Sequence, residues 1–224
     1  MRDQVKNINV AIDGPAGAGK STVAKLVASE LGLRYLDTGA MYRALTHLVI
    51  ERGIDPHDEE TIASLSLTME FGLDGQSRLT LGGEVLGEEI RTPEVSGLVS
   101  LVSSHRSVRE AIVHMQQVMA REGGIVMDGR DIGTTVMTDA EVKIFLTADI
   151  RERARRRWLE MQEKGYKVDL GEIVSTVEKR DLFDSSRETS PLRPANDALI
   201  LDTTDLSLTQ VVQRILDIVA ERRS

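Results

Sequence analysis

The sequence predicts an α/β fold, in which a parallel sheet is flanked by helices and carries a small antiparallel insert. An alternating apolar run, Asn7 to Asp13, precedes a glycine-rich turn and a segment with helical spacing. Further apolar runs at residues 125–127 and 142–146 are each followed by a helical segment, the alternation typical of parallel sheets. Residues 68–89 carry hairpin signals instead. The length of 224 residues suits a single domain, residues 1–224.

Composition narrows the functional classes. The net charge of −8 and an aromatic content of 3% argue against a nucleic-acid-binding module. The chain has no cysteine, so disulfide and thiolate chemistry are excluded. It shows no signal-peptide pattern and no apolar run long enough to cross a bilayer. We therefore expect a cytoplasmic protein without membrane or nucleic-acid partners. We also expect a monomer, although composition does not fix the oligomeric state.

The glycine-rich turn reads GPAGAGKST and matches the pattern GxxxxGK[ST], the P-loop. In this pattern backbone N–H groups face phosphate oxygens, lysine supplies a cation, and the following helix directs its positive dipole end at the anion. The hydroxyl of Ser21 stands where Mg²⁺ is held. The loop therefore predicts binding of a nucleoside triphosphate with Mg²⁺. The predicted triphosphate-binding residues in it are Gly14, Pro15, Ala16, Gly17, Ala18, Gly19, Lys20, Ser21 and Thr22.

A second strand and helix are expected next. Residues 33–37 form a short apolar run, and Thr38 is the predicted N-cap of the helix that follows. Arg43 lies off the apolar stripe of this helix, so it is free to face a cleft. Asp55 and Pro56 predict the start of a further helix.

The insert is expected to hold about three antiparallel strands, because Asp74-Gly75 and Gly82-Gly83 separate short alternating runs. Helical spacing resumes after Pro93 and again from Val108 to Met119. Arg109 stands beside Val108 and is expected to face away from the apolar stripe.

A compact apolar strand ends at Asp128, a pattern typical of the acidic strand end that faces Mg²⁺ in P-loop proteins. Arg130 and Asp131 follow it, at the sheet edge where open parallel sheets collect their ligands. Residues 142–146 and 198–201 are predicted as two further buried strands. Ser207 with Gln210 predicts a capping box for the last helix.

The basic segment RERARRRWLEMQEKG carries five arginines in its first seven positions. Clustered cations are favoured where an anion binds among them, although most charge runs are solvated helix faces. We expect the solvated face for Arg151 and Arg153. We expect phosphate contact for Arg155, Arg156 and Arg157, because guanidinium forks suit phosphoryl oxygens and a flap carrying them would exclude water.

One further set of residues allows two interpretations, and the histidines allow one. Arg180, Asp184 and Arg187 are spaced so that one helical face presents two guanidinium groups around a carboxylate, which suits either a site or a surface salt-bridge ladder. The histidines have no metal-ligand spacing, so no metal or catalytic role is expected for them. They are His47, His57, His105 and His114.

Taken together, the motifs resemble those of bacterial cytidylate kinases. The matching pieces are GPAGAGKST, DTGAMYR, the hairpin insert, VREA, DGRDIGT, the arginine-rich flap and KRDLFDSSR, which together cover nearly the whole chain. The resemblance implies a P-loop nucleoside kinase fold with three parts. These are a core, a nucleoside monophosphate-binding insert at residues 38–107 and a flap at residues 150–168.

The resemblance also implies an activity, the transfer of the γ-phosphoryl group of ATP to CMP or dCMP. Arg43 and Arg130 would hold the acceptor phosphate. The residues around the cytosine would be Ser100, Arg109, Asp131 and Arg187, with Thr38 near the base, where relatives often carry serine. Arg180 and Asp184 would reach the ribose. The implied catalytic residues are Lys20, Arg130, Arg156 and Arg157, with Arg156 also on ATP, and the implied Mg²⁺ ligands are Ser21 and Asp128.

Simple chemistry agrees with these roles. Cytosine offers an amino donor beside two acceptors, which a carboxylate and guanidinium groups complement. Uracil would place an acceptor against the Asp131 carboxylate, at a cost of about 1–3 kcal/mol, or tenfold to a few hundredfold in selectivity. The acceptor phosphate is largely ionised at neutral pH, so in-line transfer needs positioning and charge neutralisation but no general base.

Two alternatives stay open at this point. One is another small-molecule kinase on the same scaffold, acting on UMP, AMP or shikimate, against which DTGAMYR, DGRD and the insert argue. The other is a nucleotide-hydrolysing P-loop switch. That function would require a residue that positions water and a partner surface, and the sequence offers no clear candidate for either.

Overall fold

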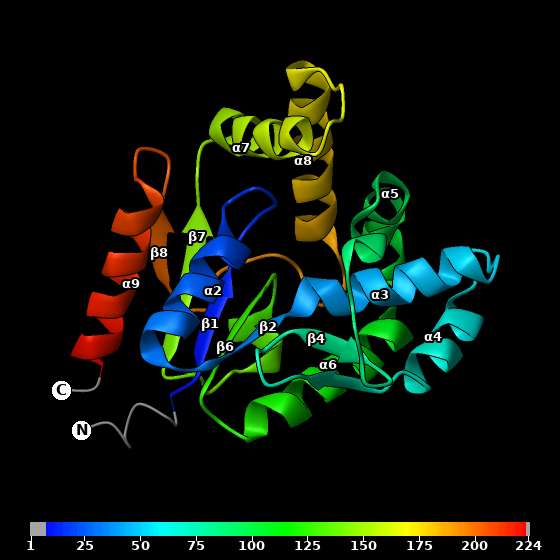
Figure 1. Cartoon of the computed structure of the whole chain (residues 1–224), viewed down its shortest axis with the longest axis horizontal. Helices are drawn as coiled ribbons and strands as arrows, with labels where there is room; N and C mark the ends of the chain where they lie inside the picture. Colours follow the sequence, from blue (N-terminus) through cyan, green and yellow to red (C-terminus); the bar gives the residue numbers. More distant parts are fainter. Residues whose placement is uncertain (1–7, 223–224) are drawn as a thin grey trace.

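The computed structural model describes residues 8–222, which fold around a five-stranded parallel sheet (Figure 1). The strand order is β2-β6-β1-β7-β8, and each neighbouring pair is parallel. The strands are β1 (Val10–Asp13), β2 (Arg34–Asp37), β6 (Ile125–Gly129), β7 (Val142–Thr147) and β8 (Leu199–Asp202). The predicted first strand began at Asn7, which lies outside the described residues. The register pairs Asp37 with Asp128, so acidic residues meet at the carboxyl edge.

Helices cover both faces of the sheet, as predicted. On one face α2 (Lys20–Leu31) and α9 (Leu208–Glu221) pack against alternate strand residues such as Ile12 and Val126. The other face carries α3 (Thr38–Glu51) and α6 (Arg106–Arg121), which bury the remaining residues, among them Leu36 and Met127. The period-2 alternation of β1 and β6 thus supplies two hydrophobic cores, one on each side.

The insert contains the predicted antiparallel sheet, in the order β3-β4-β5. Its elements are α4 (Glu59–Leu67), β3 (Phe71–Leu73), β4 (Leu79–Leu81), β5 (Glu84–Val85), the short helix η1 (Glu88–Arg91) and α5 (Pro93–Val102). Helix α4 begins later than the predicted start at Asp55 and Pro56. Asp58 is its N-cap and accepts a hydrogen bond from the N–H of Thr61 at 3.0 Å. The division into core, insert and flap stays a prediction.

The basic segment forms helix α7 (Ile150–Glu163), which packs against α8 (Leu170–Ser186) above the loop between β1 and α2 (Figure 1). The pair has a small core of its own, which contains Ala154, Ile173 and Val177. At the far end of α7, Lys164 Nζ lies 2.9 Å from the Glu88 carboxylate of η1. One exposed ion pair therefore joins the flap segment to the insert.

Strand β8 corrects one sequence prediction. We expected residues 198–201 to form a buried strand, yet Leu199 is 43% and Ile200 65% exposed, and Leu201 alone of the four β8 residues is buried. The reason is the strand's position at the edge of the sheet. The capping box at Ser207 and Gln210 is confirmed. Within residues 8–222, no helix has both the length and the apolar character needed to cross a membrane.

Candidate active site

The P-loop lies between β1 and α2, at the carboxyl edge of the sheet. Gly14 has φ +148°, and a Cβ there would meet the carbonyl oxygen of Leu146 at 2.0 Å. Gly17 has φ +76°, and its Cβ would lie 2.7 Å from the Arg153 carbonyl oxygen. Both glycines are thus required by conformation and by close backbone approach. The N-cap of α2, Gly19, offers no side chain to the first helical N–H groups, which suits an anion at the helix N-terminus.

Lys20 opens α2 and is buried, with its Nζ donating to the carbonyl oxygen of Pro15 at 2.8 Å. Burial and the nearby Arg130 guanidinium lower the pKa of Lys20 well below its usual range. An anion bound in the loop would oppose both effects and favour the charged ammonium.

Ser21 and Asp128 meet across the site, as their predicted role as Mg²⁺ ligands requires. Ser21 Oγ donates to Asp128 Oδ2 at 2.9 Å, and the Tyr35 hydroxyl donates to Oδ1 at 2.7 Å. Burial, together with the nearby Asp37 carboxylate, raises the pKa of Asp128 to about 6. A hydroxyl and a carboxylate are the hard oxygen donors that Mg²⁺ prefers, so this pair fits the ion.

Asp37, rather than the predicted Thr38, caps helix α3. Its carboxylate accepts from the N–H of Ala40 at 2.9 Å, whereas Thr38 is the first helical residue and donates to the Asp128 carbonyl oxygen at 2.7 Å. Asp37 Oδ2 also lies 2.9 Å from Arg91 Nη2 and 3.4 Å from Arg43 Nη2. Although burial opposes ionisation, Arg43 and Arg91 hold the pKa of Asp37 below its usual range. The cap therefore also orients a predicted phosphate-binding arginine.

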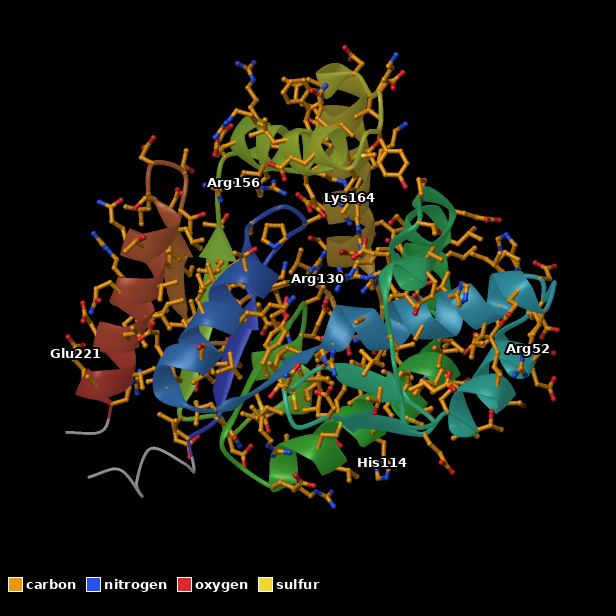
Figure 2. All side chains as sticks on the ribbon, in the orientation of Figure 1. Arg52, His114, Arg130, Arg156, Lys164 and Glu221 are labelled. Carbon is orange, nitrogen blue, oxygen red and sulfur yellow. The ribbon has the colours of Figure 1, made fainter. Side chains whose placement is uncertain are left out.

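Several arginines converge near the middle of the molecule, where Figure 2 labels Arg130. Arg130 Nε donates to Asp184 Oδ2 at 2.9 Å. Burial and the charge of Arg130 lower the pKa of Arg180 to about 9. Burial lowers the pKa of Arg157 too, and the charges of Arg43 and Arg130 add to that effect. These arginines are close enough to repel one another, so the site is built to receive an anion.

Asp184 anchors this cluster. It is 1% exposed and accepts hydrogen bonds from Arg130 and Arg187. Burial would raise its pKa, but Arg130 and Arg187 hold the pKa of Asp184 below its usual range. The reading of Arg180, Asp184 and Arg187 as a surface salt-bridge ladder is therefore wrong.

Beside the cluster, Arg109 and Asp131 form a buried ion pair, with Arg109 Nη2 2.5 Å from Asp131 Oδ2. Arg109 Nη1 donates to the carbonyl oxygen of Ser103 at 3.2 Å, and Arg187 Nη2 donates to Ser103 Oγ at 3.2 Å. Ser100 contributes its carbonyl oxygen, which accepts from Ser103 Oγ at 3.2 Å. The serine that links the two arginines is therefore Ser103, and base contact by Ser100 stays a prediction.

The arginines of α7 divide differently from the prediction. Arg153, expected on a solvated face, is 7% exposed and forms an ion pair with Asp181. Arg155 is exposed and pairs with Glu152 of its own helix. Arg156 donates to Thr203 Oγ1 at 3.0 Å and to the Thr203 carbonyl oxygen at 2.7 Å, on the β8 side of the P-loop (Figure 2). Arg157 is half-buried beside the arginine cluster.

Comparison with known proteins identifies the family. The family model described as cytidylate kinase matches residues 10–221. The chain belongs to the cytidylate kinase family. A cytidylate kinase of Caldicellulosiruptor bescii is 50% identical over 217 residues, 96% of each chain. A cytidylate kinase of Bacillus cereus strain B4264 is 51% identical over 218 residues, 96% of this chain and 97% of that one.

A solved structure supports the fold. An uncharacterized protein from Eubacterium ventriosum has a TM-score of 0.52 at 14% identity, covering 96% of this chain and 99% of its own. At that identity the likeness concerns the fold alone.

The structure adds residues to this cytidylate kinase family site that sequence reasoning missed. Both carboxylate oxygens of Asp13 accept backbone N–H groups, from Ile132 and from Gly133, each at 2.8 Å. Burial and the Asp131 carboxylate raise the pKa of Asp13 to about 7. The position of Asp13 at a strand end was the available signal, but its partners lie about 120 residues away in the sequence. Arg91 and Asp181 were also missed, because their partners Asp37 and Arg153 lie 54 and 28 residues away in the sequence.

Proposed function

We propose that this protein transfers the γ-phosphoryl group of ATP to CMP or dCMP, giving ADP with CDP or dCDP. The observation that carries the proposal is the buried Arg109–Asp131 pair beside a cluster of arginines that faces a P-loop. The pair offers a carboxylate and a guanidinium for a pyrimidine edge, the cluster offers cations for a phosphate, and the loop offers N–H groups for the triphosphate. Membership of the cytidylate kinase family supports the same assignment.

The proposed base recognition uses the two oxygens of Asp131 differently. Arg109 engages Oδ2, which fixes the carboxylate, so we assign Oδ1 to the amino group of cytosine. Arg109 and Arg187 would donate to the ring acceptors, with Ser103 holding both guanidinium groups in place and Ser100 as the predicted further contact. Thr38 donates its hydroxyl to the Asp128 carbonyl oxygen, and its position near the base stays a prediction.

The proposed chemistry needs positioning and charge neutralisation. Arg43 and Arg130 would hold the phosphate of CMP, while Arg180 and Asp184 would bind the ribose. Lys20, Arg156 and Arg157 would neutralise the charge that spreads over the equatorial oxygens during in-line transfer. The CMP phosphate is already ionised at neutral pH, so no side chain has to remove a proton.

Ser21 and Asp128 would hold Mg²⁺, because their oxygens meet at 2.9 Å beside the loop. The ion, when bound, draws electron density from the phosphate oxygens and orients them. A cytoplasmic location and a monomeric state stay predictions from the sequence, and light scattering after gel filtration checks the second.

An ADP-release assay tests the function. Purified protein with ATP and Mg²⁺ should release ADP fastest with CMP or dCMP, more slowly with UMP, and at background with AMP, shikimate or water. Equal release without any acceptor would favour the hydrolysing switch. A preference for AMP or shikimate would favour the related kinases.

The substitution Asp131→Asn tests base selection. The neutral amide can present either a donor or an acceptor to the base. The ratio of kcat/KM for CMP to kcat/KM for UMP, which reflects a wild-type preference of about 1–3 kcal/mol, should therefore fall toward unity. An unchanged ratio would remove Asp131 from base selection. Glu110→Gln, an exposed carboxylate on α6, is the matched control and should leave the ratio as it is.

A further inference from the structure

One side chain from α7 and one from α8 bind the same residue of the P-loop. Asp181 Oδ1 of α8 accepts a hydrogen bond from the N–H of Ala16 at 3.3 Å. Arg153 Nη1 of α7 donates to the carbonyl oxygen of Ala16 at 3.0 Å and also to Asp181 Oδ2. Both backbone groups of Ala16 are thus bound by a single ion pair, which we call the Ala16 clasp.

The clasp fixes a neighbouring peptide plane. The carbonyl of Ala16 and the N–H of Gly17 belong to one planar peptide bond, and the described residues contain no cis peptide. In a trans peptide the two groups point in opposite directions. With the carbonyl held toward the Arg153 guanidinium, the N–H of Gly17 points away from that guanidinium.

The loop has little room to adopt another orientation. A Cβ at Gly17 would lie 2.7 Å from the Arg153 carbonyl oxygen and 3.1 Å from Arg153 Cβ, so the two backbones are in close contact. Arg153 is itself held, because its Nε donates to the Ala148 carbonyl oxygen at 3.0 Å and its side chain is 8% exposed. A buried guanidinium with several acceptors is far more restricted than a surface arginine.

We propose that Arg153 and Asp181 are positioning residues for the phosphates of ATP. They act by presetting the peptide between Ala16 and Gly17, so that the loop's N–H groups are aimed before the nucleotide arrives. This inference rests on the proposed function in so far as the P-loop is taken to bind ATP. A loop already in its binding conformation loses less conformational entropy when the ligand binds, so the clasp increases affinity for the donor nucleotide.

If Arg153 and Asp181 only stabilised the fold, a different result would be expected. Their loss would then lower the stability of the protein and its affinity for both substrates together. Loss of a clasp confined to Ala16 should weaken ATP binding and leave the arginine cluster that receives CMP unchanged. The split between the two substrates therefore separates the explanations.

The experiment measures nucleotide affinity directly, by calorimetry with ATP and Mg²⁺ and, separately, with CMP. Asp181→Asn keeps an acceptor for the N–H of Ala16 but removes the charge that holds Arg153, and Arg153→Met removes the guanidinium. We expect the Kd for ATP to rise about tenfold to a hundredfold in either variant, with the Kd for CMP changing less than about twofold. The double variant should be no worse than the poorer single variant, because the pair acts as one unit.

Two exposed residues on the same helices serve as matched controls. Arg151→Met on α7 and Glu178→Gln on α8 should leave both affinities unchanged. Unchanged ATP affinity in Asp181→Asn and Arg153→Met, equal losses for ATP and CMP, or additive losses in the double variant would each overturn the proposal. Wild-type protein that binds ATP but phosphorylates no acceptor would instead overturn the proposed function, and the ATP titrations would still test the clasp.

Arg153→Lys provides a second variant if the methionine form folds poorly. Lysine keeps the charge but has no planar fork, so it cannot reach Ala148, Ala16 and Asp181 together. We expect an intermediate loss of ATP affinity with the thermal midpoint close to that of the wild type. Wild-type ATP affinity in this variant would show that charge alone suffices and would overturn the geometric argument.

Discussion

The two halves of the proposed site present positive charge to phosphate in different ways. The half around the P-loop relies on backbone groups, with Gly14, Gly17 and Gly19 at positive φ and one buried lysine. The half around Arg130 relies on guanidinium side chains collected from different elements and held by carboxylates such as Asp184 and Asp37. The first depends on local sequence, the second on tertiary packing.

This difference has an electrostatic consequence. In the P-loop half, N–H groups and the helix dipole carry partial charges that need no counter-ion. In the arginine half, burial lowers the pKa values of Arg180 and Arg157, and repulsion by the full charge of Arg130 adds to that effect. Asp184 holds Arg130 and Arg187 together by accepting a hydrogen bond from each of them. Substitutions should therefore affect the two substrates separately.

The largest expected effect is on the P-loop half. Lys20→Met removes the cation that the proposed mechanism assigns to the transferred group, and we expect kcat to fall about 10³-fold, with the Kd for CMP changed less than about twofold. Steady-state kinetics with CMP titrations check this. Lys25→Met, an exposed lysine on the same helix, is the control. A large loss of CMP affinity in Lys20→Met would contradict the separation of the halves.

Arg130→Lys should have the next largest effect. Lysine cannot both donate to Asp184 and present a fork to the phosphate, so we expect kcat/KM for CMP to fall about 100-fold. The Kd for ATP should stay near the wild-type value. Equal damage to both nucleotides, measured by calorimetry, would mean that the halves act as one unit.

Asp184→Asn tests the anchor of the arginine half. Removing the carboxylate charge leaves Arg130 and Arg187 less well held and their mutual repulsion uncompensated. We expect the KM for CMP to rise about tenfold and the free energy of unfolding to fall by about 3 kcal/mol. Added phosphate should restore part of the stability by binding among the arginines. Stability that does not respond to phosphate would argue against an anion site there.

Asp13→Asn tests the boundary between the halves, with the smallest expected effect on catalysis and its main effect on the pH dependence of stability. The folded-state pKa of Asp13, about 7, lies above its usual value of 3.8, so the folded protein holds this proton more tightly than the unfolded chain. The protonated Asp13 therefore stabilises the folded state at low pH. As pH rises from 4 to 7, this contribution to the free energy of unfolding is lost, at no more than about 1.4 kcal/mol per pH unit. The unfolding free energy of wild type minus variant, from urea titrations, should therefore fall over this range. A difference that is flat with pH would assign Asp13 an ordinary pKa.

Sequence predicted the P-loop half more completely than the arginine half. Gly14 to Thr22 lie together in sequence, and their glycine spacing reports backbone geometry directly. Arg153 was misplaced because its partner, Asp181, is 28 residues further along, and an arginine among charged neighbours reads as solvated. The burial of Asp184 was equally hidden, since spacing gives a helical face but not what covers it.

Smaller errors have the same origin. Residue type favours Thr38 as the N-cap of α3. Asp37 is the N-cap because β2 ends at Asp37 and α3 begins at the next residue. The apolar run at residues 198–201 reads as a buried strand, although its place at the sheet edge leaves Ile200 exposed. The residue types predict that a strand or helix forms, but the elements packed against it decide which of its faces is buried.

Lys164, at the end of α7, forms an ion pair with Glu88 of η1. Both side chains are more than a third exposed, so water and salt weaken their attraction to at most about 1 kcal/mol. So small an energy corresponds to a several-fold bias between the joined and separated arrangements. An ion pair this weak does not lock the end of α7 to η1, so the two segments can separate at this contact at little cost in free energy.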